Sequence, residues 1–318
     1  MSPVNPFRPP ALAAIEADLE AGKTILIDGA TGTELERRGA PMHDKAWCAT
    51  ATLTSPDVLR SVHEDYIRAG ARLITTNTFS TNRNVLEPAG QGDKVTEINR
   101  RAVELAIEAR ERTGSQDRVV VAGSMSHQVP YERLDEKRRQ RHVPPPDEAS
   151  ANFREMAGIL ANAGVDLILM EMMSDPVLAN AAIDAAHATG LPLWVGFSLK
   201  TEDSGTLVSE ARPELDAETI FKSIPLDRAD VAGIMHSDAD TTTRGLELLK
   251  RHWSGPTMAY PDSGYFVMPH WQFVDIMPPE TFVDRHREWI ASGVQVVGGC
   301  CGLGLEHIQA LAASLASA

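Results

Sequence analysis

Cysteine, basic charge and long apolar runs are all scarce in this chain. Three cysteines in 318 residues exclude a disulfide framework, so adjacent thiols in a reducing compartment are better explained as metal ligands or redox groups. No apolar run approaches the roughly 20 residues of a membrane span, and the start "MSPVNPFRPP" lacks the apolar core of a secretory signal. We therefore expect a cytoplasmic protein that does not bind membranes.

The charge balance also argues against nucleic-acid partners. The formal net charge is −14, with 30 basic and 44 acidic residues, and this charge repels phosphate backbones and anionic lipids. The one basic cluster, "RLDEKRRQRH" at 133–142, is interleaved with acids and is interpreted as a solvated loop or helix face. A small molecule is the expected partner.

Short apolar, mostly β-branched runs recur along the whole chain and predict eight buried strands. They lie at 24–28, 72–79, 119–125, 165–173, 192–199, 231–237, 256–261 and 294–299. Most are separated by amphipathic helical stretches, such as the one that follows Ser55 and Pro56 and ends near Gly70. Eight such units predict a single (βα)₈ TIM-type barrel, with an open doubly wound sheet as the alternative. We expect one domain over 1–318, in which 1–22 form an N-terminal extension or helix.

Polar side chains stand at or just after the ends of these runs, where the active site of such a barrel is built. They are Asp28, Asn77, Ser124, Glu171, Ser198, His236, Asp262, Cys300 and Cys301. Neighbouring strand residues point to opposite faces, so two adjacent cysteines can share one ion only where the chain leaves extended geometry. The glycines of "VQVVGGCCG" at 294–302 permit that. Two thiolates and a third ligand suit a catalytic zinc site, although spacing alone fits small buried side chains equally well.

Five ordered segments give the chain a family resemblance. They are "LIDGATGTELERRG" (26–39), "HEDYIRAGARLITTNTF" (63–79), "NAGVDLILMEM" (162–172), "YPDSG" (260–264) and "GGCCG" (298–302). Together they resemble the homocysteine S-methyltransferase family over about residues 25–310. The resemblance implies a zinc-dependent methyltransferase that moves a methyl group from a small sulfonium or quaternary ammonium donor to homocysteine, giving methionine.

The resemblance also implies roles for particular residues. The two adjacent zinc cysteines of the family fall on Cys300 and Cys301, and its acidic residues that hold the amino group of homocysteine fall on Asp28 and Glu171. Alternatives are a turn cap for Asp28 and a buried partner of a backbone group for Glu171. Substrate contacts are further expected from Gly29, Thr78, Phe79, Asp262 and Tyr265. Aromatic candidates for the donor site are Trp47, Phe79, Tyr131, Tyr265, Phe266 and Trp271.

The chain departs from the family pattern at several positions. The third zinc cysteine is replaced by His236 in "GIMHSD", so the predicted ligands are His236, Cys300 and Cys301. A neutral imidazole makes the site one unit less negative, which predicts a firmer hold on a less nucleophilic thiolate; alternatively, the site has lost its metal. Asp262 and Tyr265 stand where the family has Asn and Glu, and His127 and Gln128 change the loop after the third strand.

These departures leave other functions open. One is methyl transfer to a different thiol or to a selenol, and another is a metal- or ligand-binding barrel without methyl transfer. A homo-oligomer is an expectation from the family alone.

Overall fold

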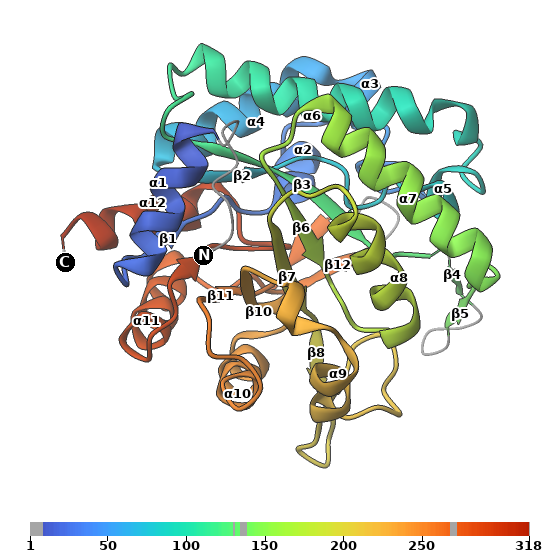
Figure 1. Cartoon of the computed structure of the whole chain (residues 1–318). Coiled ribbons are helices and arrows are strands. Elements are labelled where there is room, and N and C mark those ends of the chain that lie inside the picture. Colours follow the sequence, from blue (N-terminus) through green and yellow to red (C-terminus); the bar gives the residue numbers. More distant parts are fainter. Residues whose placement is uncertain (1–8, 130, 134–138, 268–271, 318) are drawn as a thin grey trace.

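Eight parallel strands form the centre of the molecule (Figure 1). The computed structural model describes residues 9–129, 131–133, 139–267 and 272–317, without the side chains of 131–133 and 139–141. The strands are β1 (Ile25–Leu26), β2 (Leu73–Thr75), β3 (Val120–Ser126), β6 (Leu167–Glu171), β7 (Leu193–Phe197), β10 (Val231–Met235), β11 (Thr257–Tyr260) and β14 (Val296–Val297). Each coincides with one of the eight predicted runs, so these predictions are confirmed.

The sheet closes into a barrel. Its hydrogen-bonded order is β1-β14-β11-β10-β7-β6-β3-β2, and a parallel bridge between Ile27 and Leu73 joins the first strand to the last. Two backbone hydrogen bonds complete this seam, from Arg72 N to Leu26 O (2.8 Å) and from Asp28 N to Leu73 O (3.1 Å). The (βα)₈ prediction is confirmed, and the open doubly wound alternative is wrong.

Helices surround the sheet and connect successive strands. They are α1 (Pro10–Glu20), α2 (Thr31–Arg37), α3 (Ala51–Thr54), α4 (Pro56–Ala69), α5 (Arg83–Leu86), α6 (Val95–Arg112), α7 (Pro146–Ala163), α8 (Pro176–His187), α9 (Ala217–Ser223), α10 (Ala239–Leu249), α11 (Pro279–Ala291) and α12 (Leu305–Ala316), with 3₁₀ turns η1 (Gly92–Lys94) and η2 (Leu226–Arg228). As predicted, α4 begins at Pro56 and ends at Gly70, whose φ of +112° favours glycine. None of the described helices combines the length and the apolar character that a bilayer crossing requires.

The barrel interior is packed with side chains rather than open. Its apolar cluster contains Leu167, Trp194 and Met258, together with Ala11, Leu12, Ile15 and Leu19 of α1. Helix α1 therefore covers one end of the barrel, and fully burying each of its large aliphatic side chains contributes about 1.5–3 kcal/mol. The same cluster extends to Cys300, which follows β14. The interior packing thus reaches from α1 to the carboxyl ends of the strands.

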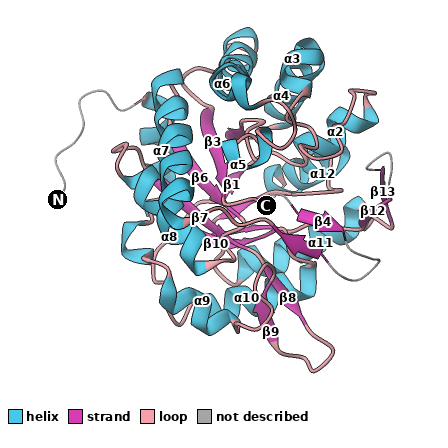
Figure 2. Ribbon diagram, turned by 90° about the vertical axis from the view of Figure 1, so that its right-hand side faces the viewer, coloured by secondary structure: helices cyan, strands magenta, loops and turns pink. Residues whose placement is uncertain are grey.

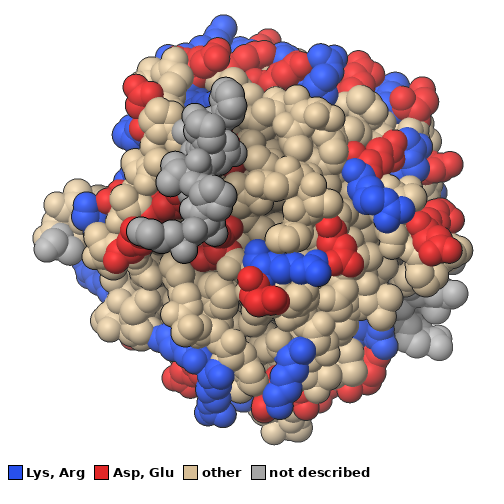
Figure 3. Space-filling model, in the orientation of Figure 1, with Lys and Arg blue, Asp and Glu red and all other residues tan. Residues whose placement is uncertain are grey.

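Three antiparallel hairpins follow β3, β7 and β11. They are β4 (Tyr131–Arg133) with β5 (Arg139–Arg141), β8 (Leu199–Thr201) with β9 (Leu207–Ser209), and β12 (Tyr265–Val267) with β13 (Gln272–Val274). In Figure 2, β4, β12 and β13 lie on the right, on the side of the molecule opposite α7 and α8. The basic cluster at 133–142 was expected to be a loop or helix face, but its residues 139–141 form a strand. On the face drawn in Figure 3, basic side chains are interspersed with acidic ones.

Candidate metal centre

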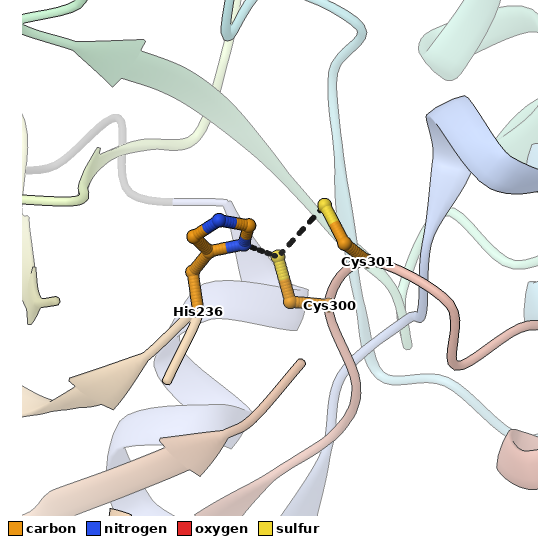
Figure 4. Close-up of side chains that lie close together, drawn as sticks. All are labelled: His236, Cys300 and Cys301. Carbon is orange, nitrogen blue, oxygen red and sulfur yellow. Dashed lines mark hydrogen bonds between the residues drawn. The ribbon is translucent and has the colours of Figure 1, made fainter. Parts of the chain in front are cut away.

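Three ligand-type side chains meet at the carboxyl ends of β10 and β14 (Figure 4). The Sγ atom of Cys300 lies 3.6 Å from Nδ1 of His236 and 4.0 Å from Sγ of Cys301. One ligand atom from each residue lies within 4.8 Å of the other two. With usual bond lengths, tetrahedral zinc separates two sulfur ligands by about 3.8 Å, and a sulfur from a nitrogen by about 3.6 Å. The predicted ligands therefore come together with the donor types and spacing that zinc requires.

The turn after β14 brings both cysteines to one side. Cys300 N donates to Pro261 O (2.7 Å) and Ser263 N donates to Cys301 O (3.0 Å), so the turn is fastened to the segment after β11. Gly302 has φ +81°, and a Cβ at this position would lie 2.1 Å from Ser263 O. Only glycine fits this close approach, which agrees with the expectation that the chain leaves extended geometry here.

His236 occupies a left-handed backbone conformation, with φ +43°. For a residue other than glycine, such a conformation costs on the order of 1–3 kcal/mol and persists only where the surroundings impose it. Here Ser198 Oγ donates to His236 O (2.7 Å), and His236 N donates to Tyr260 O (3.2 Å). These hydrogen bonds hold the backbone of His236 in this conformation, and its imidazole faces Cys300. The strained backbone therefore belongs to one of the three predicted metal ligands.

Charges around the three ligands favour a protonated histidine in the metal-free protein. Burial lowers the pKa of His236, but Asp262, whose Oδ2 lies 3.7 Å from Nδ1, and the Cys300 thiol raise it to about 10. The adjacent Cys301 thiol and burial raise the pKa of Cys300 above its ordinary range. Metal ligands must be deprotonated, so binding an ion here releases protons and is weakened in acid.

Two buried carboxyl groups lie at the carboxyl ends of strands β1 and β6, which are separated in the barrel by β2 and β3. Asp28, which follows β1 and is 3 % exposed, accepts hydrogen bonds from Thr75 N (2.6 Å) and Thr75 Oγ1 (3.0 Å). Glu171, the last residue of β6, is buried and accepts a short hydrogen bond from Ser124 Oγ. Burial raises the pKa of Asp28 to about 8 and that of Glu171 to about 7. Because burial disfavours their ionised forms, a bound cation would stabilise both carboxylates.

Tyr260 is a site residue that the sequence did not single out. It ends β11 and is 3 % exposed, and its hydroxyl makes no hydrogen bond of ordinary length within the described part of the chain. The hydroxyl lies close enough to Glu171 to lower the pKa that burial raises. A Cβ at Gly196 would lie 2.8 Å from this oxygen. The sequence could have indicated Tyr260 as a site residue only through its position, since it stands near the end of a predicted strand and precedes Pro261.

The remaining predicted substrate residues have different surroundings. Thr78 is buried and its Oγ1 donates to Ser124 O (2.7 Å), while Phe79 is half-buried and packs edge-on against Trp47 with ring centroids 6.5 Å apart. A Cβ at Gly29 would lie 2.6 Å from Leu303 O, so this position requires glycine. Tyr265, on β12, is 60 % exposed. Trp271 and the side chain of Tyr131 lie outside the described residues.

The changed loop after β3 is joined to the loop after β6. His127 is buried, and its Nε2 accepts hydrogen bonds from Ser174 N (2.8 Å) and Asp175 N (3.1 Å). Because Nε2 accepts both, the neutral ring carries its proton on Nδ1. Gln128 Oε1 accepts from Ser80 Oγ (2.8 Å). His127 therefore joins the loop after β3 to the loop after β6, just beyond Glu171. Gln128 joins the loop after β3 to Ser80, in the loop after β2.

The fold and the site together define the structural class of the protein. It is a closed (βα)₈ barrel with a candidate metal centre and a buried acidic pair at the carboxyl ends of its strands. Comparison with known proteins identifies the family within this class. The profile of the homocysteine S-methyltransferase family matches residues 25–315, so the chain belongs to that family and is an S-methyltransferase by class.

Relatives match this chain over most of their own length. Homocysteine S-methyltransferase 4 of Zea mays is 30 % identical over 94 % of this chain and 91 % of its own. Selenocysteine methyltransferase of Astragalus bisulcatus is 28 % identical, with 89 % of each chain covered. The metallated form of the Escherichia coli homocysteine methyltransferase MmuM superposes with a TM-score of 0.74 at 25 % identity, covering 94 % of this chain and 98 % of that one.

Proposed function

We propose that this protein is a zinc-dependent methyltransferase that moves a methyl group from a small sulfonium or quaternary ammonium donor to homocysteine, giving methionine. The carrying observation is the placement of His236, Cys300 and Cys301 at the same barrel end as Asp28 and Glu171. The donor set of one imidazole and two thiols fits zinc and leaves one tetrahedral position for an acceptor. Bound there, zinc supplies a lowered thiol pKa, so that the acceptor reacts as a thiolate.

The acidic pair supplies the means to hold the acceptor. Asp28 and Glu171 are buried, and burial raises the pKa of both, to about 8 and about 7. An ammonium group placed between them would convert both into stabilised carboxylates, which fixes the amino-acid end of the acceptor. In this role Thr75 and Ser124 orient the carboxyl oxygens through the hydrogen bonds that they already donate.

The transfer itself is a substitution at the methyl carbon. The acceptor thiol loses its proton to solvent, and its sulfur then forms the new bond to the methyl carbon. The bond from that carbon to the donor sulfonium or ammonium atom breaks, and its electron pair stays with the donor, which leaves as a neutral thioether or amine. Nothing is oxidised or reduced. The barrel residues contribute by aligning the sulfur and the methyl group.

A selenol acceptor is the second candidate. A relative that covers 89 % of this chain is a selenocysteine methyltransferase. His236 in place of a thiolate ligand also makes the site less negative, which lowers the nucleophilicity of an acceptor thiolate, and a selenolate is the more reactive nucleophile. The two candidates differ only in the acceptor.

The test is mass-spectrometric detection of methylated product from zinc-loaded protein. Homocysteine, cysteine and selenocysteine are each offered with S-methylmethionine, S-adenosylmethionine, dimethylsulfoniopropionate and glycine betaine. Methionine formed with one donor supports the proposal, whereas product from selenocysteine alone supports the second candidate. No product from any pair, with zinc bound, refutes both and favours a binding role. Cytoplasmic location and homo-oligomer formation remain predictions.

A further inference from the structure

The segment that carries the two cysteines is held at a peptide group just before them. β14 ends at Val297, and the peptide between Gly298 and Gly299 follows it. The N–H of this peptide belongs to Gly299 and donates to Asp28 O (3.2 Å). Its carbonyl belongs to Gly298 and lies 2.9 Å from Nε2 of His286. Because the N–H and the carbonyl of a trans peptide point in opposite directions, the two contacts fix the peptide plane from both sides.

This peptide depends on outside contacts because glycine flanks it on both sides. Without Cβ atoms, Gly298 and Gly299 permit rotations of the peptide plane that other residues resist. At Gly298 the fold requires glycine, because a Cβ there would lie 2.3 Å from Ile27 Cγ1. The direction of the chain as it enters Cys300 is therefore set by groups outside the segment.

His286 is a fully buried imidazole on α11, and both of its nitrogens face carbonyl oxygens. Nδ1 lies 2.8 Å from Phe282 O, four residues earlier in the helix, and Nε2 faces Gly298 O. Burial lowers the pKa of His286 to about 4, so the ring is neutral near pH 7 and donates from one nitrogen only. Phe282 O is already the regular acceptor of the helical N–H of His286. No other hydrogen bond within the described part of the chain ends at Gly298 O, so the proton belongs on Nε2.

We propose that His286 is a positioning residue of the metal centre, whose Nε2–H holds the Gly298 carbonyl and so sets the direction in which the two cysteines leave β14. The same peptide group donates to Asp28 O, so the contact also places the cysteines relative to a residue proposed to hold the acceptor. His286 acts through the turn and is not itself a ligand. This inference rests on the metal-binding part of the proposed function.

Two substitutions separate the two contacts of the ring. His286→Gln keeps an amide N–H close to the position of Nε2, whereas His286→Asn keeps one close to Nδ1, where it faces Phe282 O. Zinc affinity of the full-length proteins is measured by chelator competition. His286→Asn should weaken zinc binding about 10–100-fold, the range usual for groups that orient metal ligands, and His286→Gln should retain most of the affinity. The control is Thr243→Val, which removes the acceptor of a hydrogen bond (2.9 Å) from Trp289 on the same helix and should leave zinc affinity unchanged.

Cobalt(II) in place of zinc gives a readout that a loss of stability alone does not move. The absorption bands of a cobalt–thiolate site report the arrangement of its ligands. They should change in His286→Asn and stay as in the wild type in His286→Gln and Thr243→Val. Wild-type affinity and bands in His286→Asn overturn the inference. Equal losses in the Asn and Gln variants, or an equal loss in Thr243→Val, also overturn it, because the bond to Gly298 is then not the cause.

If His286→Asn does not fold, the wild-type ring is examined by ¹⁵N NMR near neutral pH. Nε2 should carry the proton and Nδ1 should not, and a proton on Nδ1 would overturn the inference. A wild type that binds no zinc would refute it together with the metal-binding part of the proposed function. Zinc-binding protein that yields no methylated product would refute the proposed methyl transfer alone.

Discussion

Replacing Glu171 by glutamine should make the protein relatively more stable at high pH and should weaken its binding of homocysteine. The folded protein holds a proton on Glu171 up to a pKa of about 7 because the carboxyl group is buried. The unfolded chain releases that proton near a pKa of about 4.3. Between these two values the folded state binds more protons than the unfolded state, so the stability of the wild type falls as the pH rises. The amide introduced by Glu171→Gln does not titrate, so the free energy of unfolding of the variant does not fall with pH for this reason.

The size of the effect follows from the two pKa values. From pH 5.5 to pH 8, ionisation of Glu171 removes about 2 kcal/mol from the free energy of unfolding. For a chain of this length that corresponds to a Tm change of about 3 °C. The Tm of Glu171→Gln minus that of the wild type should therefore rise by about this amount across the range. Asp28 adds to the same trend, because the Glu171 charge raises its pKa further.

Thermal unfolding of metal-free protein at the two pH values measures this difference. Subtracting the wild type cancels any constant effect of the amide, and Glu202→Gln, on an exposed turn, is the matched control with no expected trend. The same variant of Glu171 should bind homocysteine at least about 30-fold more weakly, because a buried charge partner of the ammonium group is lost. A Tm difference that is flat or falls with pH would refute the assignment of a buried, proton-holding Glu171.

Three further substitutions test the site. Cys301→Ser should weaken zinc binding by more than about 100-fold in a chelator competition, whereas Cys48→Ser, which changes a cysteine outside the cluster, should not. Gly29→Ala places a Cβ 2.6 Å from Leu303 O and should abolish most turnover in a steady-state assay while zinc stays bound; near-normal kcat/KM would contradict the tight approach. His127→Ala leaves two buried N–H groups without their acceptor and should lower stability by about 2–5 kcal/mol in denaturant unfolding, and a loss below about 1 kcal/mol would argue against its role as a loop fastener.

The barrel was predictable because its signal is repeated. Buried strands such as β6 and β7 read as continuous apolar runs, and eight of them alternating with helices leave few arrangements. The hairpins were not predictable in the same way. Each of their strands spans three residues, which is too short for a periodic pattern.

The candidate site, like the fold, was predictable from the sequence only in part. The sequence left Cys300 and Cys301 open between metal ligands and small buried side chains, and His236 could be added only through the family resemblance; the structure brings all three together. What the sequence could not supply was the left-handed backbone at His236, which depends on hydrogen bonds from other strands. Tyr260 was missed because its burial beside Glu171 arises only in the folded barrel.

The most direct test of the account is a comparison of metal-free and zinc-reconstituted protein from one preparation. Transfer of a deuterated methyl group from S-methylmethionine to homocysteine is followed by mass spectrometry, with Cys301→Ser treated in parallel. The account predicts labelled methionine from the reconstituted wild type, with little from the metal-free protein and from the variant. Equal turnover in all three samples would show that the His236, Cys300 and Cys301 cluster does not carry the reaction.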